Sequence, residues 1–370
     1  MRSIILFSII FFISPKLFSQ GCCSGGSGSP IAGGASQGVL LDRQVELGVN
    51  YQYISTDTFK AGDRDTASLF DSFKSNYLYF RVAYGVTKNF TMSVESGYFI
   101  NKTQIELLNA DTFQSSGIGD LIIFPRYDIL NHTEEKKRTE ITLGLGYKIP
   151  LGKYNDSNIV YTNPLNGHHT WIVSPPSVQP TNGSNDLIFY GFFFRSYPLK
   201  NFRIFSNLLY VRKGWNPMGE KFGDYASIGL FAGKTFFKKL GVTLQVKGEW
   251  IDKMKWNKNI DMLGIYGVDV KSTGGRKVLF VPQLSYSYKS FTIYALSEIP
   301  LYQYVNLVQV ASKFQLTIGL SYRFFAYKSG IVKPTDNTSE VIYVCPMHPE
   351  VTSTVPAKCP KCGMDLVKKE

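Results

Sequence analysis

Between Leu41 and Ala326 the chain repeats a two-residue alternation of apolar and polar side chains. The first segment sets Val45, Leu47, Val49, Tyr51 and Tyr53 against Glu46, Gly48, Asn50 and Gln52. Successive side chains of a β-strand point to opposite faces, so this pattern predicts a strand with one apolar and one polar face. Clear alternation recurs near 90–100, 140–149, 242–250 and 314–324. Rougher segments lie near 76–86, 118–130, 186–197, 202–213, 223–235, 278–289 and 291–299.

The twelve predicted strands are joined by connections of two kinds. Those after the even-numbered segments are short, at 87–88, 131–138, 198–201, 236–240 and 289–290. Those after the odd-numbered segments are longer, and the longest is 151–185. A soluble sandwich would show the same alternation, but short turns at one end and long loops at the other are typical of outer-membrane β-barrels. The sequence therefore predicts an all-β, antiparallel outer-membrane barrel of about twelve strands over 41–326, followed by a small metal-knuckle domain.

Composition agrees with this interpretation. Charged residues make up 18% of the 370 residues and aromatic residues 15%, whereas a soluble domain carries about 25% charge. No apolar run after the N-terminus is long enough for a membrane-spanning helix. Barrel closure would satisfy every backbone group within the lipid. An even strand count places both termini on the short-turn side, which the outer-membrane pattern makes periplasmic.

Residues 1–20 have the pattern of a secretory signal peptide, with Arg2 before a short apolar core, a polar exit from Ser14-Pro15 and cleavage expected after Gln20. The net charge is +12. In an exported protein this charge favours anionic lipid head groups or anionic solutes as partners and excludes nucleic acid. Residues 21–40 form a flexible Gly/Ser-rich segment with the pair Cys22-Cys23. These thiols could bind a soft metal; the alternatives are an oxidised pair or lipid attachment at Cys22.

Several motifs between residues 110 and 325 resemble the outer-membrane transporter-like barrels of the meta-pathway phenol degradation type. They include Gly117-Ile118-Gly119-Asp120-Leu121, Gly144-Leu145-Gly146-Tyr147-Lys148-Ile149-Pro150-Leu151-Gly152, Gln179-Pro180-Thr181-Asn182-Gly183-Ser184-Asn185-Asp186, Thr273-Gly274-Gly275-Arg276 and Pro300-Leu301-Tyr302-Gln303-Tyr304-Val305-Asn306. The resemblance implies a closed barrel with a transport role and no particular substrate. The chain departs from that family at its Cys-Cys lead-in and its C-terminal extension.

Charged residues of both signs fall on the expected inner face. They are Glu46, Arg81, Glu95, Asp120, Lys148, Lys247, Glu249 and Arg323. Such a lining suits a narrow polar channel, or a plugged barrel held by ion pairs across the lumen. His168-His169 in the longest loop could bind metal outside the cell, but an adjacent His pair in an exposed loop more often has no metal role. No nucleophile–base arrangement is apparent, so a non-enzymatic function is expected.

The C-terminal extension has the spacing of a metal site. After a polar linker at 327–342, the segment 343–368 contains Cys345-x2-His348-x10-Cys359-x2-Cys362. Three sulfur atoms and one nitrogen suit Zn²⁺ or a softer ion such as Cu(I). Met347 and Met364 are further thioether candidates. A segment this short buries too little apolar surface to fold alone, so metal binding is expected to drive its folding. In an oxidising periplasm Cys359 and Cys362 could instead form a disulfide.

The same segment resembles the heavy-metal-binding domain found on copper-transporting ATPases and periplasmic metal-efflux adaptors. The matching residues are Tyr343, Cys345-Pro346-Met347-His348-Pro349, Cys359-Pro360, Cys362-Gly363-Met364 and Leu366. The resemblance implies heavy-metal binding linked to copper, with Cys345, His348, Cys359 and Cys362 as ligands. A structural zinc knuckle is the alternative.

Three functions follow as hypotheses. The first is an outer-membrane channel with a periplasmic heavy-metal-binding tail for copper-type transport or homeostasis, with metal-efflux components as candidate partners. The second is a passive transporter of small aromatic or hydrophobic solutes with a structural zinc knuckle. The third is a non-conducting barrel that anchors a metal chaperone.

Overall fold

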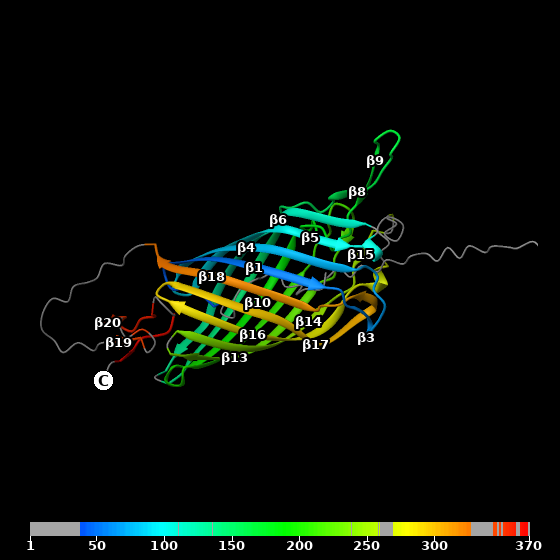
Figure 1. Ribbon diagram of the computed structural model, residues 1–370. Coiled ribbons are helices and arrows are strands. Elements are labelled where there is room, and N and C mark those ends of the chain that lie inside the picture. Colours follow the sequence, from blue (N-terminus) through cyan, green and yellow to red (C-terminus); the bar gives the residue numbers. More distant parts are fainter. Residues whose placement is uncertain are drawn as a thin grey trace, which may run out of the picture.

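The computed structural model describes residues 38–109, 111–134, 136–237, 239–257, 259, 269–326, 343–345, 348, 351–359 and 363–368. Twelve long strands form the barrel (Figure 1). They are β1 Gln44–Thr56, β4 Ser72–Thr87, β5 Phe90–Ile105, β6 Thr112–Thr133, β7 Arg138–Pro150, β10 Asp186–Tyr197, β11 Phe202–Arg212, β13 Tyr225–Phe236, β14 Leu240–Ile251, β16 Gly275–Tyr288, β17 Phe291–Val310 and β18 Phe314–Phe325.

Short strands and 3-10 turns lie in the connections of the barrel, and three further short strands form the C-terminal tail. In the connections lie β2 Phe59–Gly62, β3 Arg64–Asp65, β8 Ser157–Thr162, β9 His169–Val173, β12 Glu220–Lys221 and β15 Lys255–Trp256, with the 3-10 turns η1 Leu107–Asn109, η2 Pro198–Lys200 and η3 Val270–Ser272. The tail contains β19 Tyr343–Val344, β20 Thr352–Ser353 and β21 Val367–Lys368. Among the described residues no helix is long and apolar enough to cross a membrane.

The barrel is closed and antiparallel. Each strand pairs with its neighbours in the chain, β18 pairs with β1 from Phe325↔Gln44 to Phe314↔Ser55, and β16 pairs with β17. Twelve strands joined in this way leave no free edge, because every wall strand has a partner on both sides. The predicted fold class and strand count are confirmed.

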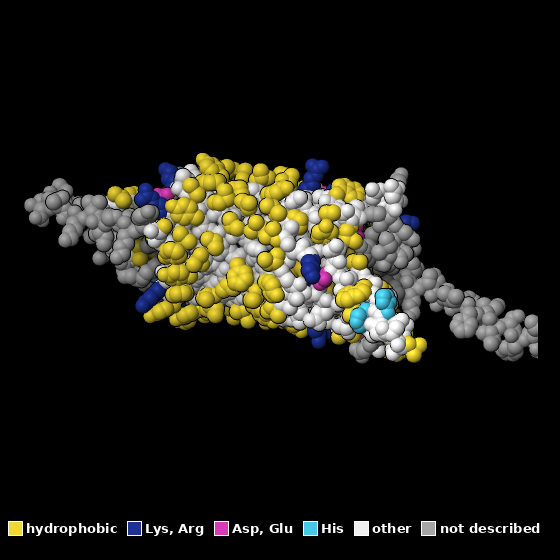
Figure 2. All heavy atoms as spheres, turned by 90° about the horizontal axis from the view of Figure 1, so that it is seen from above, with side chains coloured by type: hydrophobic (Ala, Val, Ile, Leu, Met, Phe, Trp, Pro, Cys, Tyr) yellow, Lys and Arg dark blue, Asp and Glu magenta, His cyan; other side chains and the backbone are white. Residues whose placement is uncertain are grey.

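The pattern of exposure follows the predicted alternation. On β1 Glu46 and Asn50 are 5% exposed, whereas Leu47 and Tyr51 are 42% and 37% exposed. Figure 2 shows hydrophobic side chains spread over the outer face of the barrel wall, with Lys and Arg gathered toward its two ends. The apolar face of the strands is thus the outer one, as a membrane-embedded barrel requires.

The two ends of the barrel differ. At the short-turn end the connections are 88–89, 134–137, 198–201, 237–239 and 289–290. At the long-loop end they are 57–71, 106–111, 151–185, 213–224, 252–274 and 311–313. Gln44 opens β1 and Phe325 closes β18 at the short-turn end, and the tail lies beside that end in Figure 1.

The loop after the eleventh strand was predicted to be long, and this prediction is wrong. The eleventh strand was expected to end near 299, but β17 continues to Val310 and leaves only 311–313 as the connection. Its outer part pairs with β16 as far as Val305 and then with β2, where Val310 faces Phe59. The backbone groups after residue 299 therefore have hydrogen-bond partners in the sheet. These partners allow β17 to extend beyond the end that the sequence predicted.

A segment of the longest connection folds into the barrel at the long-loop end. Within 174–185, which we call the plug segment, Val178 and Ser184 are completely buried. Lys102 Nζ donates to the Gln179 carbonyl at 2.8 Å, and Ser177 Oγ donates to Gln104 Oε1 at 3.0 Å. These bonds tie the plug segment to the inner wall, so its polar backbone is buried without being left unpaired.

Lys148 holds the plug segment from the wall of β7. Its side chain is 1% exposed, and its Nζ lies 3.1 Å from Asp120 Oδ2 and 3.0 Å from Asp186 Oδ2. The same ammonium donates to Asn182, and Thr181 donates to Asp120, so two residues of the plug segment depend on this cluster. Gly183 completes the turn with φ +72°, a conformation that other residues adopt only with strain.

The inner wall carries more than polar residues. A buried cluster inside the barrel contains Ile122, Phe124, Ile188, Tyr190, Phe192, Phe205, Leu209, Val211, Tyr225 and Phe231. Phe205 and Phe231 stack with ring centroids 4.3 Å apart. One wall of the lumen, formed by β6, β10, β11 and β13, is therefore aromatic, and the uneven alternation of 186–197 reflects it.

Candidate metal centre at the mouth of the barrel

All eight charged residues expected on the inner face form ion pairs. Arg81 lies 3.3 Å from Glu46 and 3.4 Å from Glu95, and Arg323 Nε lies 2.5 Å from Glu46 Oε2. Lys247 and Glu249 are 2.7 Å apart, while Lys148 pairs with Asp120. The inner wall is thus neutralised locally, as expected for a lumen held by ion pairs.

Glu46, Arg81 and Arg323 line a cavity of about 270 Å³ inside the barrel, which reaches the tail at the short-turn end. The N-terminal residues 38–41 form part of its wall: Leu40 N donates to Thr91 Oγ1 at 2.8 Å, and the Gly38 carbonyl accepts from Arg126 at 3.1 Å. Residues 38–40, the described end of the expected flexible segment, therefore lie inside the barrel.

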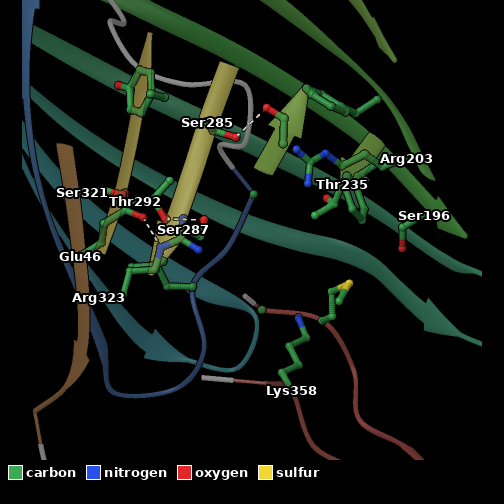
Figure 3. Close-up of a pocket in the computed structure, with 18 of the residues that line it drawn as sticks. Glu46, Ser196, Arg203, Thr235, Ser285, Ser287, Thr292, Ser321, Arg323 and Lys358 are labelled. Carbon is green, nitrogen blue, oxygen red and sulfur yellow. Dashed lines mark hydrogen bonds and ion pairs between the residues drawn. The ribbon is translucent and has the colours of Figure 1, made fainter. Parts of the chain in front are cut away.

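The tail completes the cavity. His348, Lys358, Gly363 and Met364 line it together with barrel residues, and Figure 3 shows Lys358 on the tail and Arg323 and Glu46 on the barrel around the same space. Burial, and next the charge of Arg138, lowers the pKa of Lys358. A predicted metal ligand thus lies at the boundary between the tail and the lumen.

The candidate ligands come together in two turns of the tail. Cys345 opens the first turn, where His348 N donates to the Cys345 carbonyl at 3.2 Å and Cys345 N donates to the Val351 carbonyl at 3.1 Å. Cys359 opens the second turn, in which Gly363 N donates to the Cys359 carbonyl at 2.7 Å. Gly363 has φ +71°, a backbone conformation that glycine adopts without strain.

The donor atoms have the spacing of a tetrahedral site. His348 Nδ1 lies 3.8 Å from Cys345 Sγ and 3.4 Å from Cys359 Sγ, and the three donor atoms all lie within 4.8 Å of one another. A sulfur and a nitrogen bound to one tetrahedral Zn²⁺ stand about 3.5 Å apart, from bond lengths near ~2.3 and ~2.0 Å. Both cysteines are fully buried thiols. The donor set therefore fits a thiophilic metal ion.

A small apolar core supports the ligands. Cys345, Cys359 and Leu366 are buried together, with Tyr343, Val351, Ala357 and Met364 packed against them. β19 pairs with β20 and with β21, which fixes the chain on both sides of Cys345. This core is very small, so it supplies little stability of its own.

The remaining candidates differ in status. Met364 packs against the cysteines and its carbonyl accepts from Cys359 N at 2.5 Å, while its thioether as a ligand stays a prediction. Cys362, Met347, Cys22 and Cys23 lie outside the described residues. His169 Nδ1 bonds Thr162 Oγ1 at 2.9 Å across the β8–β9 hairpin. Within the described ranges, Cys345, His348 and Cys359 form the one group of three suitable ligands.

Sequence reasoning did not foresee that the tail contacts the barrel. Arg138 on β7 donates to the Gly363 carbonyl at 2.7 Å, and Thr133 Oγ1 on β6 donates to Asp365 Oδ2 at 2.5 Å. The polar linker at 327–342 carries no signal that the following domain folds back.

Comparisons with known proteins identify the tail and the barrel separately. Residues 342–369 match the family model of the heavy metal binding domain, which confirms that resemblance. The fold is similar to that of the COG4313 outer membrane channel from Pseudomonas putida F1, with a TM-score of 0.59 and 12% identity over 80% of this chain and 100% of that one. This likeness shows the fold of an outer-membrane β-barrel.

A weaker likeness is to the toluene transporter TodX from Pseudomonas putida, with a TM-score of 0.37 and 10% identity over 76% of this chain and 88% of that one. At that score it supports no inference about this chain. A sequence comparison with curated proteins gives no match. The meta-pathway type of barrel stays a prediction.

Proposed function

We propose that this chain is an outer-membrane β-barrel whose tail binds a heavy-metal ion at the periplasmic mouth, in copper-type heavy-metal transport or homeostasis. The observation that carries the proposal is the cluster of Cys345, His348 and Cys359 in a segment that matches the heavy metal binding domain. A barrel of twelve paired strands needs no tethered knuckle for its own stability. A metal-handling role therefore explains the tail better than a structural one.

The membrane location rests on the outer surface of the barrel. Side chains such as Val82, Leu145 and Leu230 are 52%, 54% and 59% exposed on wall strands, where water would penalise them. In lipid the same side chains are favourable, and the closed ladder leaves no wall strand with an unpaired edge. Lipid is therefore the expected surroundings of the wall.

Orientation follows from the two kinds of connection. In outer-membrane barrels the short turns are periplasmic and the long loops face outside. The short-turn end carries Gln44, Phe325 and the tail, so both termini are expected in the periplasm. The metal site would then meet metal-efflux components, which are the candidate partners in that compartment.

The choice of metal follows from donor chemistry. Two thiolates and an imidazole bind Zn²⁺ and Cu(I) well. If Cys362 completes the site, the four donors fit a closed tetrahedral site without room for a substrate. Such a site stores, passes or senses an ion and is not suited to catalysis.

A second candidate function is passive transport of small aromatic or hydrophobic solutes. Phe192, Phe194 and Phe205 line both the lumen wall and the cavity. Aromatic rings attract apolar and aromatic solutes. For this function the tail would be a structural zinc knuckle, and substitutions at the metal ligands would unfold the tail without changing metal tolerance.

A third candidate is the non-conducting barrel that anchors a metal chaperone. The buried plug segment and the paired charges of the lumen support it, because both occupy the interior of the barrel. In a conducting barrel we expect the plug segment to move.

Metal tolerance of cells that produce the chain tests the proposal. Cells carrying Cys345→Ser with Cys359→Ser should lose tolerance to copper or zinc relative to cells carrying the natural chain. Val355→Ser is a matched control, since Val355 is 61% exposed on the same tail. Equal tolerance of all three, with equal barrel insertion, would exclude metal handling and favour the second candidate.

A further inference from the structure

Polar contacts between the described residues of the tail and the barrel lie around Arg138. Arg138 is 7% exposed at the start of β7, and it donates to the Gly363 carbonyl at 2.7 Å and lies 3.5 Å from Asp365. Thr133 at the end of β6 donates to Asp365 Oδ2, the same oxygen that lies near Arg138. One turn of the barrel, between Thr133 and Arg138, therefore binds two consecutive features of the tail.

The same stretch of tail carries a metal ligand. Gly363 N donates to the Cys359 carbonyl, and Cys359 N donates to the Met364 carbonyl at 2.5 Å. The backbones of Asp365 and Lys358 form an isolated antiparallel β-bridge. Cys359 and the two groups that meet Arg138 thus belong to a single hydrogen-bonded turn. When that turn loses its shape, the Gly363 carbonyl and the Asp365 carboxylate can no longer both face Arg138.

The described residues give this turn little apolar support. Its apolar support is the small group around Cys345, Cys359 and Leu366. Domains of this size usually fold only with metal, because the free energy of binding is the free energy of folding. The surface that fits Arg138 and Thr133 is therefore expected to exist when the cysteines and His348 hold an ion.

The tail also forms part of the mouth of the barrel. His348, Lys358, Gly363 and Met364 form one side of the cavity inside the barrel. The buried Nζ of Lys358 has no hydrogen-bond partner among the described residues, and burying an ammonium in this way opposes docking. The docked state is therefore held by a small difference between the contacts of Asp365 and this cost, which suits a reversible contact.

We propose that binding of a heavy-metal ion docks the tail on the turn between Thr133 and Arg138 and closes the short-turn mouth of the barrel, and that metal loss releases the tail. The proposal rests on the metal-binding tail of the proposed function. The barrel's own β6–β7 turn is the receptor, and the tail is its partner. Metal supply would then control access to the lumen from the periplasmic side.

Mobility of the tail in the full chain tests this inference. Amide relaxation is measured by NMR for tail residues of the ¹⁵N-labelled, detergent-solubilised protein, with saturating Zn²⁺ and after chelation. With Zn²⁺ the tail should share the slow tumbling of the barrel, and chelation should convert it to the fast motion of a tethered segment. Slow tumbling that persists after chelation, or fast motion with Zn²⁺ bound, would overturn the inference.

Charge reversal separates docking from folding of the tail. Asp365→Arg should keep Zn²⁺ binding but give a mobile tail with Zn²⁺ present, because Arg138 then repels it. Adding Arg138→Asp should restore slow tumbling. Thr354→Arg is the matched control, since it adds the same charge at an exposed position of the tail and should leave the tail docked. A docked tail in Asp365→Arg would refute the assigned surface.

The failure of the proposed function would look different. If the natural chain binds neither Zn²⁺ nor Ag⁺, the soft-ion probe, the metal-binding tail itself is wrong. If it binds either ion and the tail's mobility does not respond, only the docking inference is wrong.

Discussion

Lys148 is the residue whose loss should open the barrel from the long-loop end. Its ammonium is buried between Asp120 and Asp186, at 3.1 and 3.0 Å, and it donates to Asn182 of the plug segment. Lys148→Gln keeps most of the side-chain volume and an amide donor but removes the charge. Asp186 then keeps Lys213, which lies 3.2 Å away, while Asp120 loses its pair with Lys148.

The size of the effect follows from burial. Removing one partner of a buried, hydrogen-bonded ion pair costs ~3–5 kcal/mol, because a charge is left uncompensated in the interior. At tenfold per ~1.4 kcal/mol, a share of ~3 kcal/mol acting on the plug segment changes its open population by on the order of 100-fold. Solvent screening is weak here, since the Lys148 side chain is 1% exposed and that of Asp186 is fully buried.

Single-channel recording in planar bilayers measures this population. Lys148→Gln should raise the frequency of open events by one to two orders of magnitude, in line with that estimate. Lys153→Gln is the control, because Lys153 is 69% exposed and its pair with Asp156 is a surface pair worth about 0–1 kcal/mol. Opening in Lys148→Gln that equals the control would refute the role of this cluster in holding the plug segment.

Three further predictions test other parts of the molecule. Glu46→Gln should lower the free energy of unfolding, measured by urea titration, by ~3–5 kcal/mol, because Arg81 and Arg323 lose their shared carboxylate. Asp57→Asn, the control at the exposed pair with Lys313, should lower it by about 0–1 kcal/mol. Gly183→Ala should destabilise the folded conformation of the plug segment by ~1–3 kcal/mol, because φ is +72° and a Cβ would lie 2.6 Å from Tyr154. Faster proteolysis of that loop would measure this loss. Chelation should abolish amide protection of Leu366 N, which bonds the Ala357 carbonyl at 2.7 Å, while protection in the barrel strands stays unchanged in hydrogen exchange.

The barrel wall could be predicted from the sequence because lipid imposes one physical demand on every strand. Leu47 and Tyr51 had to face outward and Glu46 inward, so the two-residue period was visible and the strand count was correct. The end of β17 was missed because its outer part is held by β2, a partner that lies outside the wall.

The interior was harder to predict, since it depends on contacts between distant segments. The plug segment contains Ser, Pro, Gln and Asn and has the composition of an exposed loop, yet its partners Lys102 and Gln104 lie on β5. The aromatic wall was obscured because β10 is apolar on both faces, with Phe189 outside and Phe192 inside.

At the metal centre the spacing of the motif predicted the approach of Cys345 and His348, because short turns bring residues three apart together. Cys359 was expected beside them as a ligand of the same metal ion. The distance between the two turns and the docking against Arg138 could not be predicted, since no local pattern encodes them. Asp365 is an ordinary polar residue in the sequence and becomes informative only through its contacts with Thr133 and Arg138.

Metal binding by the purified full chain tests the central claim most directly. Titration with Zn²⁺ and with Ag⁺, followed by metal analysis after gel filtration, should give one tightly bound ion per chain. Cys345→Ser with Cys359→Ser should abolish that binding while the barrel stays folded, as shown by its retained resistance to denaturation on gels. An equal amount of bound metal in the double variant would contradict the account.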